Sequence, residues 1–129
     1  MRRRGTARDQ IVLNIDVAPT IVAAAGLPVP NVMQGRDVSP LYLADKAPPW
    51  RDEFFYEHPT ITSRDRIPAS QGVVRRDWKY VYWPEFEYEQ LFDLTKDGRE
   101  LRNLASEPTA AARLAAARQK LKEWSTRVR

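Results

Sequence analysis

The chain has 129 residues, of which 43% are hydrophobic and 29% charged, so it can form one ordinary core and is not compositionally disordered. It contains no cysteine and a single histidine, His58, which excludes a disulfide framework, a thiolate metal site, a cysteine nucleophile and a histidine-rich metal site. Its net charge of +4 comes from basic residues that mostly alternate with acidic ones. This pattern favours a mixed solvated surface and leaves polyanion binding as an alternative.

The N-terminal segment resembles a secretory signal peptide in the order of its basic and apolar residues, but its apolar stretch is interrupted. Three arginines at residues 2–4 precede the apolar stretch 11–27, an order that signal peptides share. Asn14, Asp16 and Pro19 interrupt the stretch, so a signal peptide is not predicted. No apolar run approaches the ~20 residues that span a bilayer, and we expect no membrane contact.

Two short helices are predicted before residue 50. Residues 11–15 indicate a short buried strand or an extended entry, and Asp16 is a candidate N-cap for an apolar helix that ends at Gly26. Ser-Pro at 39–40 opens a second helix, and Ala-Pro-Pro at 47–49 forms a rigid linker. We therefore assign residues 1–49 and 50–129 to different domains.

The second domain is predicted to be an antiparallel meander covered by a helix. Its strands are expected at residues 53–57, 71–76, 78–83 and 89–94. A turn at 95–98 follows, in which Gly98 is expected to supply a positive φ, while Asp93 and Asp97 cap its amides. The final helix begins near Ser106 and presents one apolar stripe to the sheet: Leu114, Ala117, Leu121, Trp124 and Val128.

The residues alone predict no catalytic centre. There is no Gly-rich phosphate loop and no His-Glu-x-x-His motif. His58 stands beside Glu57, but neighbours on a strand point to opposite faces, and a surface or satisfied histidine is the simpler interpretation. Arg75 can hold an anion or belong to an exposed pair with Arg76. The aromatic residues of 78–83 are expected in the core rather than stacked on bases or sugars.

Three blocks of the sequence resemble sulfatases. The first joins residues 14–20 (Asn-Ile-Asp-Val-Ala-Pro-Thr) to Ala-Gly at 25–26 and to Gln-Gly-Arg-Asp at 34–37. The second is residues 73–81, which are similar to a late strand pair of that family. The third, and most specific, combines Gln-Leu-Phe-Asp-Leu at 90–94 with Asn-Leu-Ala at 103–105. Together they cover nearly the whole chain and resemble the C-terminal region of N-sulphoglucosamine sulphohydrolase-like enzymes and arylsulfatases.

The resemblance implies an α+β subdomain of about four antiparallel strands packed on a long C-terminal helix. It is preceded by an edge segment of an alkaline-phosphatase-like α/β domain. Sulfatases use a formylglycine, made from Cys or Ser in a Cys/Ser-x-Pro-x-Arg motif, and a Ca²⁺ ion. This chain has neither that motif nor the family's metal aspartates, so we assign it no catalytic residue, no metal ligand and no cofactor of its own.

The first functional hypothesis is therefore a sulfatase C-terminal fragment that is inactive alone. Its partners are then the missing catalytic domain and a sulfated sugar or glycosaminoglycan, and the candidate substrate contacts are Glu57, His58 and Arg75. Full-length members of the family are usually exported. A free-standing binding or assembly module for a polyanion or a partner protein is the alternative, and a nucleic-acid partner is not expected.

Overall fold

The computed structural model describes residues 7–128, so the arginines at 2–4 lie outside the described residues. The chain divides into two compact units, Met1–Asp52 and Glu53–Arg129, here called unit 1 and unit 2. Across the described part, no helix is long and apolar enough to cross a membrane.

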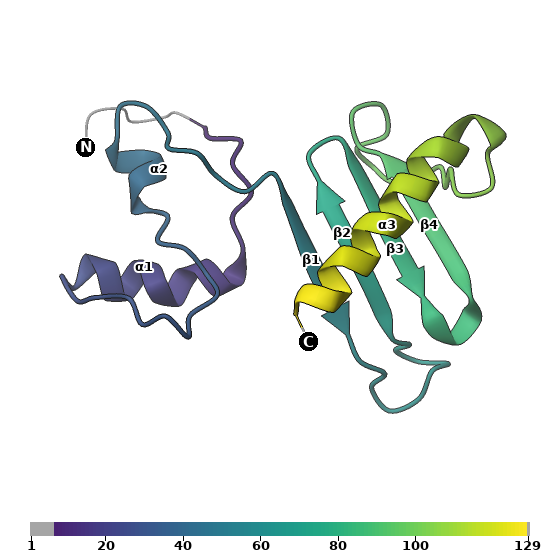
Figure 1. Ribbon diagram of the computed structural model, residues 1–129, viewed down its shortest axis with the longest axis horizontal. Helices are drawn as coiled ribbons and strands as arrows, with labels where there is room; N and C mark the ends of the chain where they lie inside the picture. The colour runs from purple at the N-terminus through teal and green to yellow at the C-terminus, as the bar shows by residue number, and fades with distance from the viewer. Residues whose placement is uncertain (1–6, 129) are drawn as a thin grey trace. The chain divides into compact units, whose positions relative to one another are not determined.

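Unit 2 is built on one four-stranded antiparallel sheet in the order β1-β2-β3-β4 (Figure 1). The strands are β1 (Glu53–His58), β2 (Ser70–Arg75), β3 (Trp78–Trp83) and β4 (Tyr88–Asp93). The short 3-10 helix η2 (Pro84–Phe86) joins β3 to β4. Each strand lies within one or two residues of its predicted position, because aromatic and β-branched runs bounded by Pro, Asp or Gly define it.

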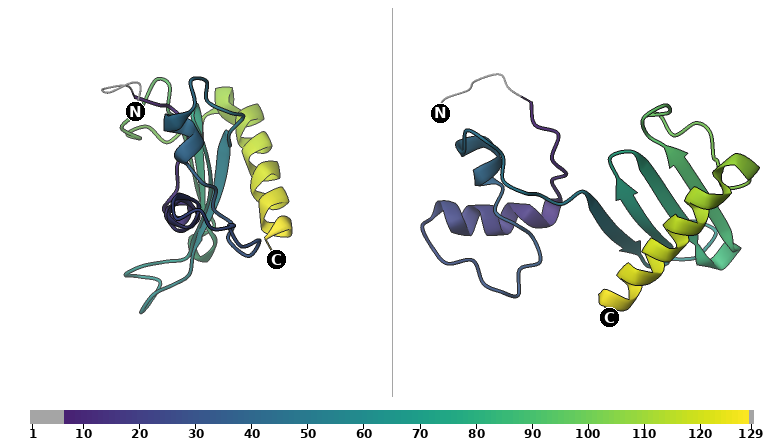
Figure 2. Two further views of the ribbon diagram at one scale, coloured as in Figure 1. Left: turned by 90° about the vertical axis from the view of Figure 1, so that its left-hand side faces the viewer. Right: turned by 45° about the horizontal axis from the view of Figure 1, so that its top comes forward.

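A single helix, α3 (Ala111–Arg127), covers one face of this sheet (Figures 1 and 2). It starts later than predicted because the 3-10 turn η3 (Pro108–Ala110) precedes it. The core lies between helix and sheet, with Val73, Tyr80 and Leu91 packing against α3 from three neighbouring strands. The helix contributes the buried part of the predicted stripe: Leu114, Ala117 and Leu121. The expected α+β arrangement of sheet and helix is confirmed.

The second half of α3 is held to β1 by polar and aromatic contacts. Trp124 stacks on Phe55 with ring centroids 6.4 Å apart, and its indole nitrogen donates to Glu53 Oε1 at 3.1 Å. Lys120 Nζ donates to the same oxygen at 3.2 Å, while Arg75 Nη1 donates to Glu53 Oε2 at 3.0 Å. One carboxylate therefore joins the helix to the first two strands.

Unit 1 contains a 3-10 turn and two helices: η1 (Asn14–Asp16), α1 (Val17–Ala24) and α2 (Ser39–Leu43). Of the two alternatives for residues 11–15, the extended entry is observed up to Leu13, whereas a buried strand is not, because Val12 and Ile15 are exposed. Gly26 does end α1 with a positive φ of 73°.

Two local predictions about turns and caps need correction. Gly98 has no positive φ; the left-handed residue of that loop is Glu100, at φ 57°, where its side chain accepts from Lys79 Nζ at 2.6 Å. Asp16 does not cap α1 through its side chain. The expected capping by Asp93 is confirmed, because its Oδ1 accepts from the Thr95 amide at 3.1 Å. Asp97 accepts instead from the amide of Arg102, beyond the turn, at 2.8 Å.

Replacing Trp124 by alanine removes the stack on Phe55 and the hydrogen bond to Glu53 together. Because Trp124 is only partly buried, we expect a loss of about 2–3 kcal/mol of unfolding free energy, below the roughly 3–5 kcal/mol typical of a fully buried tryptophan. Chemical denaturation measures it, with Gln119→Ala on the exposed side of α3 as the matched control. An unchanged midpoint for Trp124→Ala would show that α3 is held without this anchor.

Candidate functional site

The register of the sheet places one polar side chain from each strand in a single row beneath α3. Glu57 pairs with Gln71, Gln71 with Tyr82, and Tyr82 with Glu89. Because side chains alternate between faces, these four lie on the same face as the core residues Val73 and Leu91. We call Glu57, Gln71, Tyr82 and Glu89 the polar row.

Between this row and the C-terminal half of α3 lies a groove with a cavity volume of about 880 Å³. Its floor includes Gln71, Tyr82 and Glu89, and its helical wall includes Lys122, Ser125 and Thr126. This volume lies within the roughly 300–1,000 Å³ of ligand sites, but the groove is wide open to solvent and would cover only one side of a ligand. We call it the α3 groove.

The charges at the base of the groove compensate one another. Arg118 donates two hydrogen bonds to the Glu89 carboxylate, from Nε at 2.8 Å and from Nη2 at 2.5 Å. The Tyr80 hydroxyl donates to the same carboxylate at 2.5 Å. The hydrogen bonds from Arg118 lower the pKa of Glu89 in spite of its partial burial. Burial and the bond to Glu89 raise the pKa of Tyr80, so its hydroxyl remains a donor.

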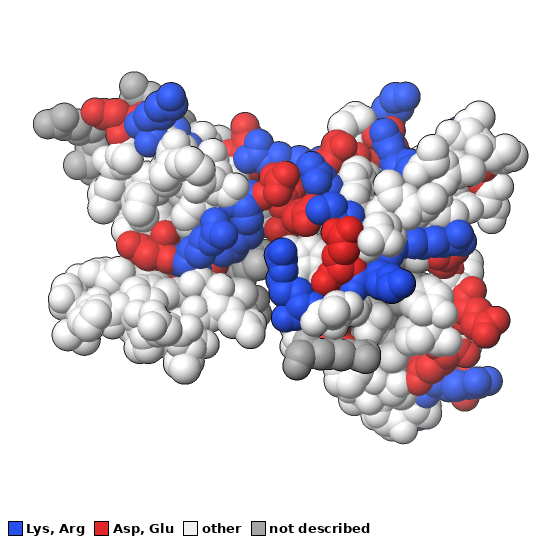
Figure 3. Space-filling model, in the orientation of Figure 1, with Lys and Arg blue, Asp and Glu red and all other residues white. Residues whose placement is uncertain are grey.

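Most basic residues of α3 are paired in the same way with carboxylates of the sheet. Arg113 contacts Asp93 at 3.0 Å and Lys120 contacts Glu53 at 3.2 Å, in addition to the Arg118–Glu89 pair. The hydrogen bond from Thr95, together with Arg113, lowers the pKa of Asp93 to about 2. Figure 3 accordingly shows blue and red side chains interspersed over the α3 side rather than one basic block.

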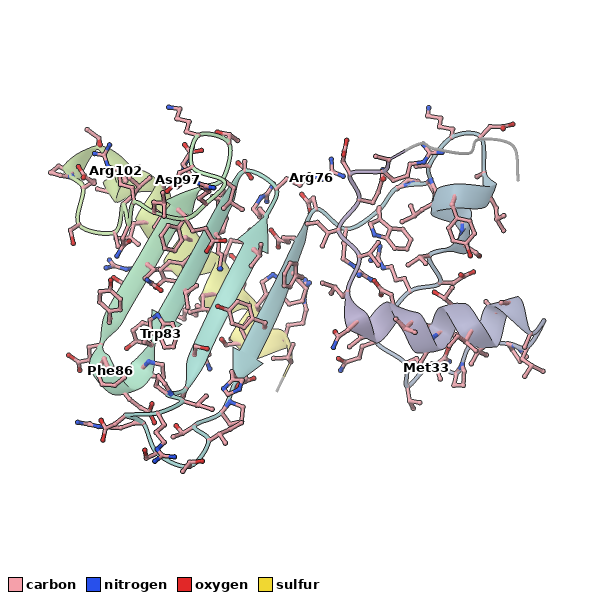
Figure 4. All side chains as sticks on the ribbon, turned by 180° about the vertical axis from the view of Figure 1, so that it is seen from behind. Met33, Arg76, Trp83, Phe86, Asp97 and Arg102 are labelled. Carbon is pink, nitrogen blue, oxygen red and sulfur yellow. The ribbon has the colours of Figure 1, made fainter. Side chains whose placement is uncertain are left out.

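The structure separates the three residues predicted to contact substrate. Glu57 belongs to the polar row and accepts from Gln71 Nε2 at 3.3 Å. Arg75 shares that face but lies at the other end of β2, where it contacts Glu53 and Asp77. His58 pairs with Ser70 and lies on the opposite face, the side on which Figure 4 shows Trp83. Contact of all three with a sulfated sugar stays a prediction.

Sequence reasoning missed the residues that line the groove, and Glu57, which it did single out, lies beside Gln71 outside that lining. Gln71 and Tyr82 stand at alternate positions of predicted strands, and Lys122 and Thr126 are four residues apart on the predicted helix. Both spacings were visible, but which strand residue meets which helix residue depends on the register and on where α3 crosses. The sequence held no signal for either.

No metal centre can be built from the described side chains. Within residues 7–128, no three Asp, Glu, His or Cys side chains lie close enough to share an ion. The Ca²⁺ of full-length sulfatases therefore finds no fitting ligand set among these residues.

Unit 1 is organised around one buried carboxylate, that of Asp16. Its two oxygens accept from the amides of Leu13 and Arg36, each at 2.8 Å. Arg51 adds a bidentate pair, at 2.5 Å to Oδ2 and 2.7 Å to Oδ1. Burial alone raises the pKa of Asp16, but the Arg51 bond, the two amides and the Arg51 charge outweigh it and lower the pKa. Asp16 thereby ties three distant stretches of unit 1 together.

The match to known proteins covers both units. Residues 2–127 match the family described as N-sulphoglucosamine sulphohydrolase, C-terminal. The chain belongs to this sulfatase C-terminal family. The resemblance seen in the sequence is thus confirmed for nearly the whole chain.

Two relatives of this sulfatase C-terminal chain come from Bacteroides thetaiotaomicron. A Delta 4,5-hexuronate-2-O-sulfatase is 30% identical over 117 residues, which is 88% of this chain and 23% of that protein. An N-acetylglucosamine-6-O-sulfatase is 25% identical over 105 residues, which is 79% of this chain and 19% of that protein. The chain therefore spans about a fifth to a quarter of the length of these curated relatives.

A similar fold also occurs in an enzyme that is not named a sulfatase. A phosphonate monoester hydrolase from Silicibacter pomeroyi matches with a TM-score of 0.77, covering 97% of this chain and 27% of that one at 24% identity. At this identity the likeness concerns the fold of the matched part alone.

Acid should loosen unit 1 through Asp16. Its pKa is lowered by folding, so the stability it contributes is present above the unfolded value near 3.8 and is lost as pH falls through the folded pKa. The amide resonances of Leu13 and Arg36 should report this titration below pH 3.8, and Asp16→Asn should abolish it. Asp45→Asn, an exposed carboxylate of unit 1, is the control. Titration of the two amides above pH 3.8 would contradict the assignment.

Proposed function

We propose that this chain is the C-terminal region of a sulfuric ester hydrolase acting on sulfated sugars, and that it has no activity without a catalytic domain. The family match over residues 2–127, confined to about a quarter of each relative, carries the proposal. Both relatives named above are sulfatases of sugar substrates. The formylglycine motif expected of the family is absent from the 129 residues, which supports the need for a second domain.

The surface of unit 1 supports a docking role toward such a domain. Many of its large apolar side chains are exposed to solvent, because the unit is too small to bury them. These are Val12, Ile15, Val17, Ile21, Leu27, Val32, Tyr42 and Leu43. Where exposed apolar side chains form a contiguous patch, they mark an interface or an aggregation site. We propose that the sulfatase catalytic domain covers it, with residues 1–49 as the edge of that domain and 50–129 as the C-terminal subdomain.

The charge pairing on α3 favours this function over the alternative of a polyanion-binding module. Arg113, Arg118 and Lys120 each face a carboxylate, so their charges are compensated within unit 2. A protein binds a polyanion mainly because its Lys and Arg side chains displace the counterions of the phosphate or sulfate groups. This gain in free energy falls when those side chains are already paired with carboxylates of the protein.

Purified alone, the chain should hydrolyse neither aryl sulfates nor aryl phosphonates in the presence of Ca²⁺. The physical reason is that none of its residues supplies the family's nucleophile. A chromogenic assay measures this, with a full-length sulfatase as positive control. Turnover that follows the chain through successive columns, at constant specific activity, would refute the proposed dependence on a catalytic domain.

Removing apolar surface from α1 should reduce self-association of the isolated chain. Ile21 is 64% exposed, and glutamine keeps the helix favourable, so Ile21→Gln should raise the monomeric fraction by weakening contacts between apolar surfaces. Size-exclusion chromatography with light scattering measures it. Leu101→Gln is the matched control, because Leu101 is 80% exposed but belongs to unit 2. An equal effect of both substitutions would argue against a specific docking face on unit 1.

A further inference from the structure

The α3 groove contains polar groups that are open to a ligand beside others that bind one another. Tyr80, Glu89 and Arg118 form one hydrogen-bonded group. Among residues 7–128, the side chains of Tyr82, Glu87 and Ser125 find no hydrogen-bond partner. At the other end of the sheet, the Glu53 carboxylate accepts hydrogen bonds from Arg75, Lys120 and Trp124 together. In the groove, the polar row meets only part of α3. Nine of its ten lining residues carry a side-chain group that can hydrogen-bond, the exception being Leu121.

We propose that the α3 groove is a saccharide-binding site that holds one pyranose unit. A sugar presents hydroxyl groups that donate and accept, and the groove offers both kinds of partner. Gln71 and the hydroxyls of Tyr82 and Ser125 can do either, while the carboxylate of Glu87 accepts. The Thr126 hydroxyl donates to the Lys122 carbonyl at 2.9 Å and can therefore accept from a sugar hydroxyl. The half-buried ring of Tyr82 adds an aromatic surface of the kind against which a sugar's C–H groups pack.

The charges of the groove set a limit on the ligand. Glu89 and Arg118 neutralise each other, which leaves Glu87 and Lys122 as one anion and one cation at the rim. Among residues 7–128, Lys122 makes no ion pair, so its ammonium group can meet a sulfate or carboxylate on the sugar. A nearly neutral lining of this kind suits a sugar with at most one anionic group, not an extended polyanion.

The choice of a saccharide over other polar ligands rests on the proposed function, because the relatives of this chain are sulfatases named for sugar substrates. The site itself rests on the register and on the contacts of α3. It also gives Glu57 a role compatible with its place in the polar row, where it holds Gln71 from the neighbouring strand.

Saturation-transfer difference NMR of the 129-residue chain with N-acetylglucosamine and with N-acetylglucosamine 6-sulfate tests the site. Both sugars should bind. Tyr82→Phe and Thr126→Ala should each weaken both by about 3- to 10-fold, the range of one lost hydrogen bond. Lys122→Ala should weaken the sulfated sugar more than the neutral one. Gln119→Ala, on α3 but outside the groove, should change neither.

Three results would overturn the proposal: no transfer to either sugar, binding that the three groove substitutions leave unchanged, or binding of the sulfated sugar alone that vanishes with salt. None of them touches the catalytic proposal, which is measured by turnover and by self-association through unit 1. Conversely, sulfatase turnover by the isolated chain would refute the proposed function and leave binding in the groove to stand or fall on the variants.

Discussion

One helix cannot cover a four-stranded sheet, and this mismatch in size shapes unit 2. An α-helix is about 10–12 Å across, whereas a six-residue strand extends about 20 Å. α3 therefore seals a single apolar row, in which Val73, Tyr80 and Leu91 meet Leu114 and Ala117. Polar rows remain on either side of that seam. One of these rows is covered where Glu53 binds Arg75 and Trp124, and the other remains open as the α3 groove.

The same geometry explains where the charges of the helix go. A basic helix on a sheet whose flanking rows end in Glu53, Glu89 and Asp93 forms three ion pairs across the interface. Partly exposed pairs of this kind contribute little stability each, and screening by salt reduces it further. Their larger consequence is for binding, because they neutralise three of the positive charges of α3 that a polyanion would recognise.

Unit 1 differs from unit 2 in the interactions that hold it together. It is too small to bury its own apolar residues, and many stay at the surface. Its order comes from the buried Asp16–Arg51 pair, which also holds the amides of Leu13 and Arg36. Removing one partner of such a pair costs about 3–5 kcal/mol, since the other charge is left buried. A buried ion pair inside and an apolar surface outside are the features expected of a segment that a larger domain covers.

The sequence by itself determined the strands, the long helix and the family. Aromatic runs bounded by Pro and Asp specify strands locally, and the three- and four-residue spacing of Leu114, Ala117 and Leu121 specifies an amphipathic helix. It also separated Glu57 from His58, because neighbours on a strand must face opposite ways. The left-handed position at Glu100 instead of Gly98, by contrast, was beyond a rule based on residue type.

Only the tertiary structure decided what the polar residues do. Asp16 had the right type and position for a helix cap, yet Arg36 and Arg51, 20 and 35 residues away, claim its carboxylate. Glu57, Gln71, Tyr82 and Glu89 became one row only when three strand pairs fixed their register, and Gln71, Tyr82 and Glu89 line a groove only because α3 packs beside them. Local sequence governs backbone conformation within a few residues. The partners of a charged or hydrogen-bonding side chain depend on residues that folding brings from far along the chain.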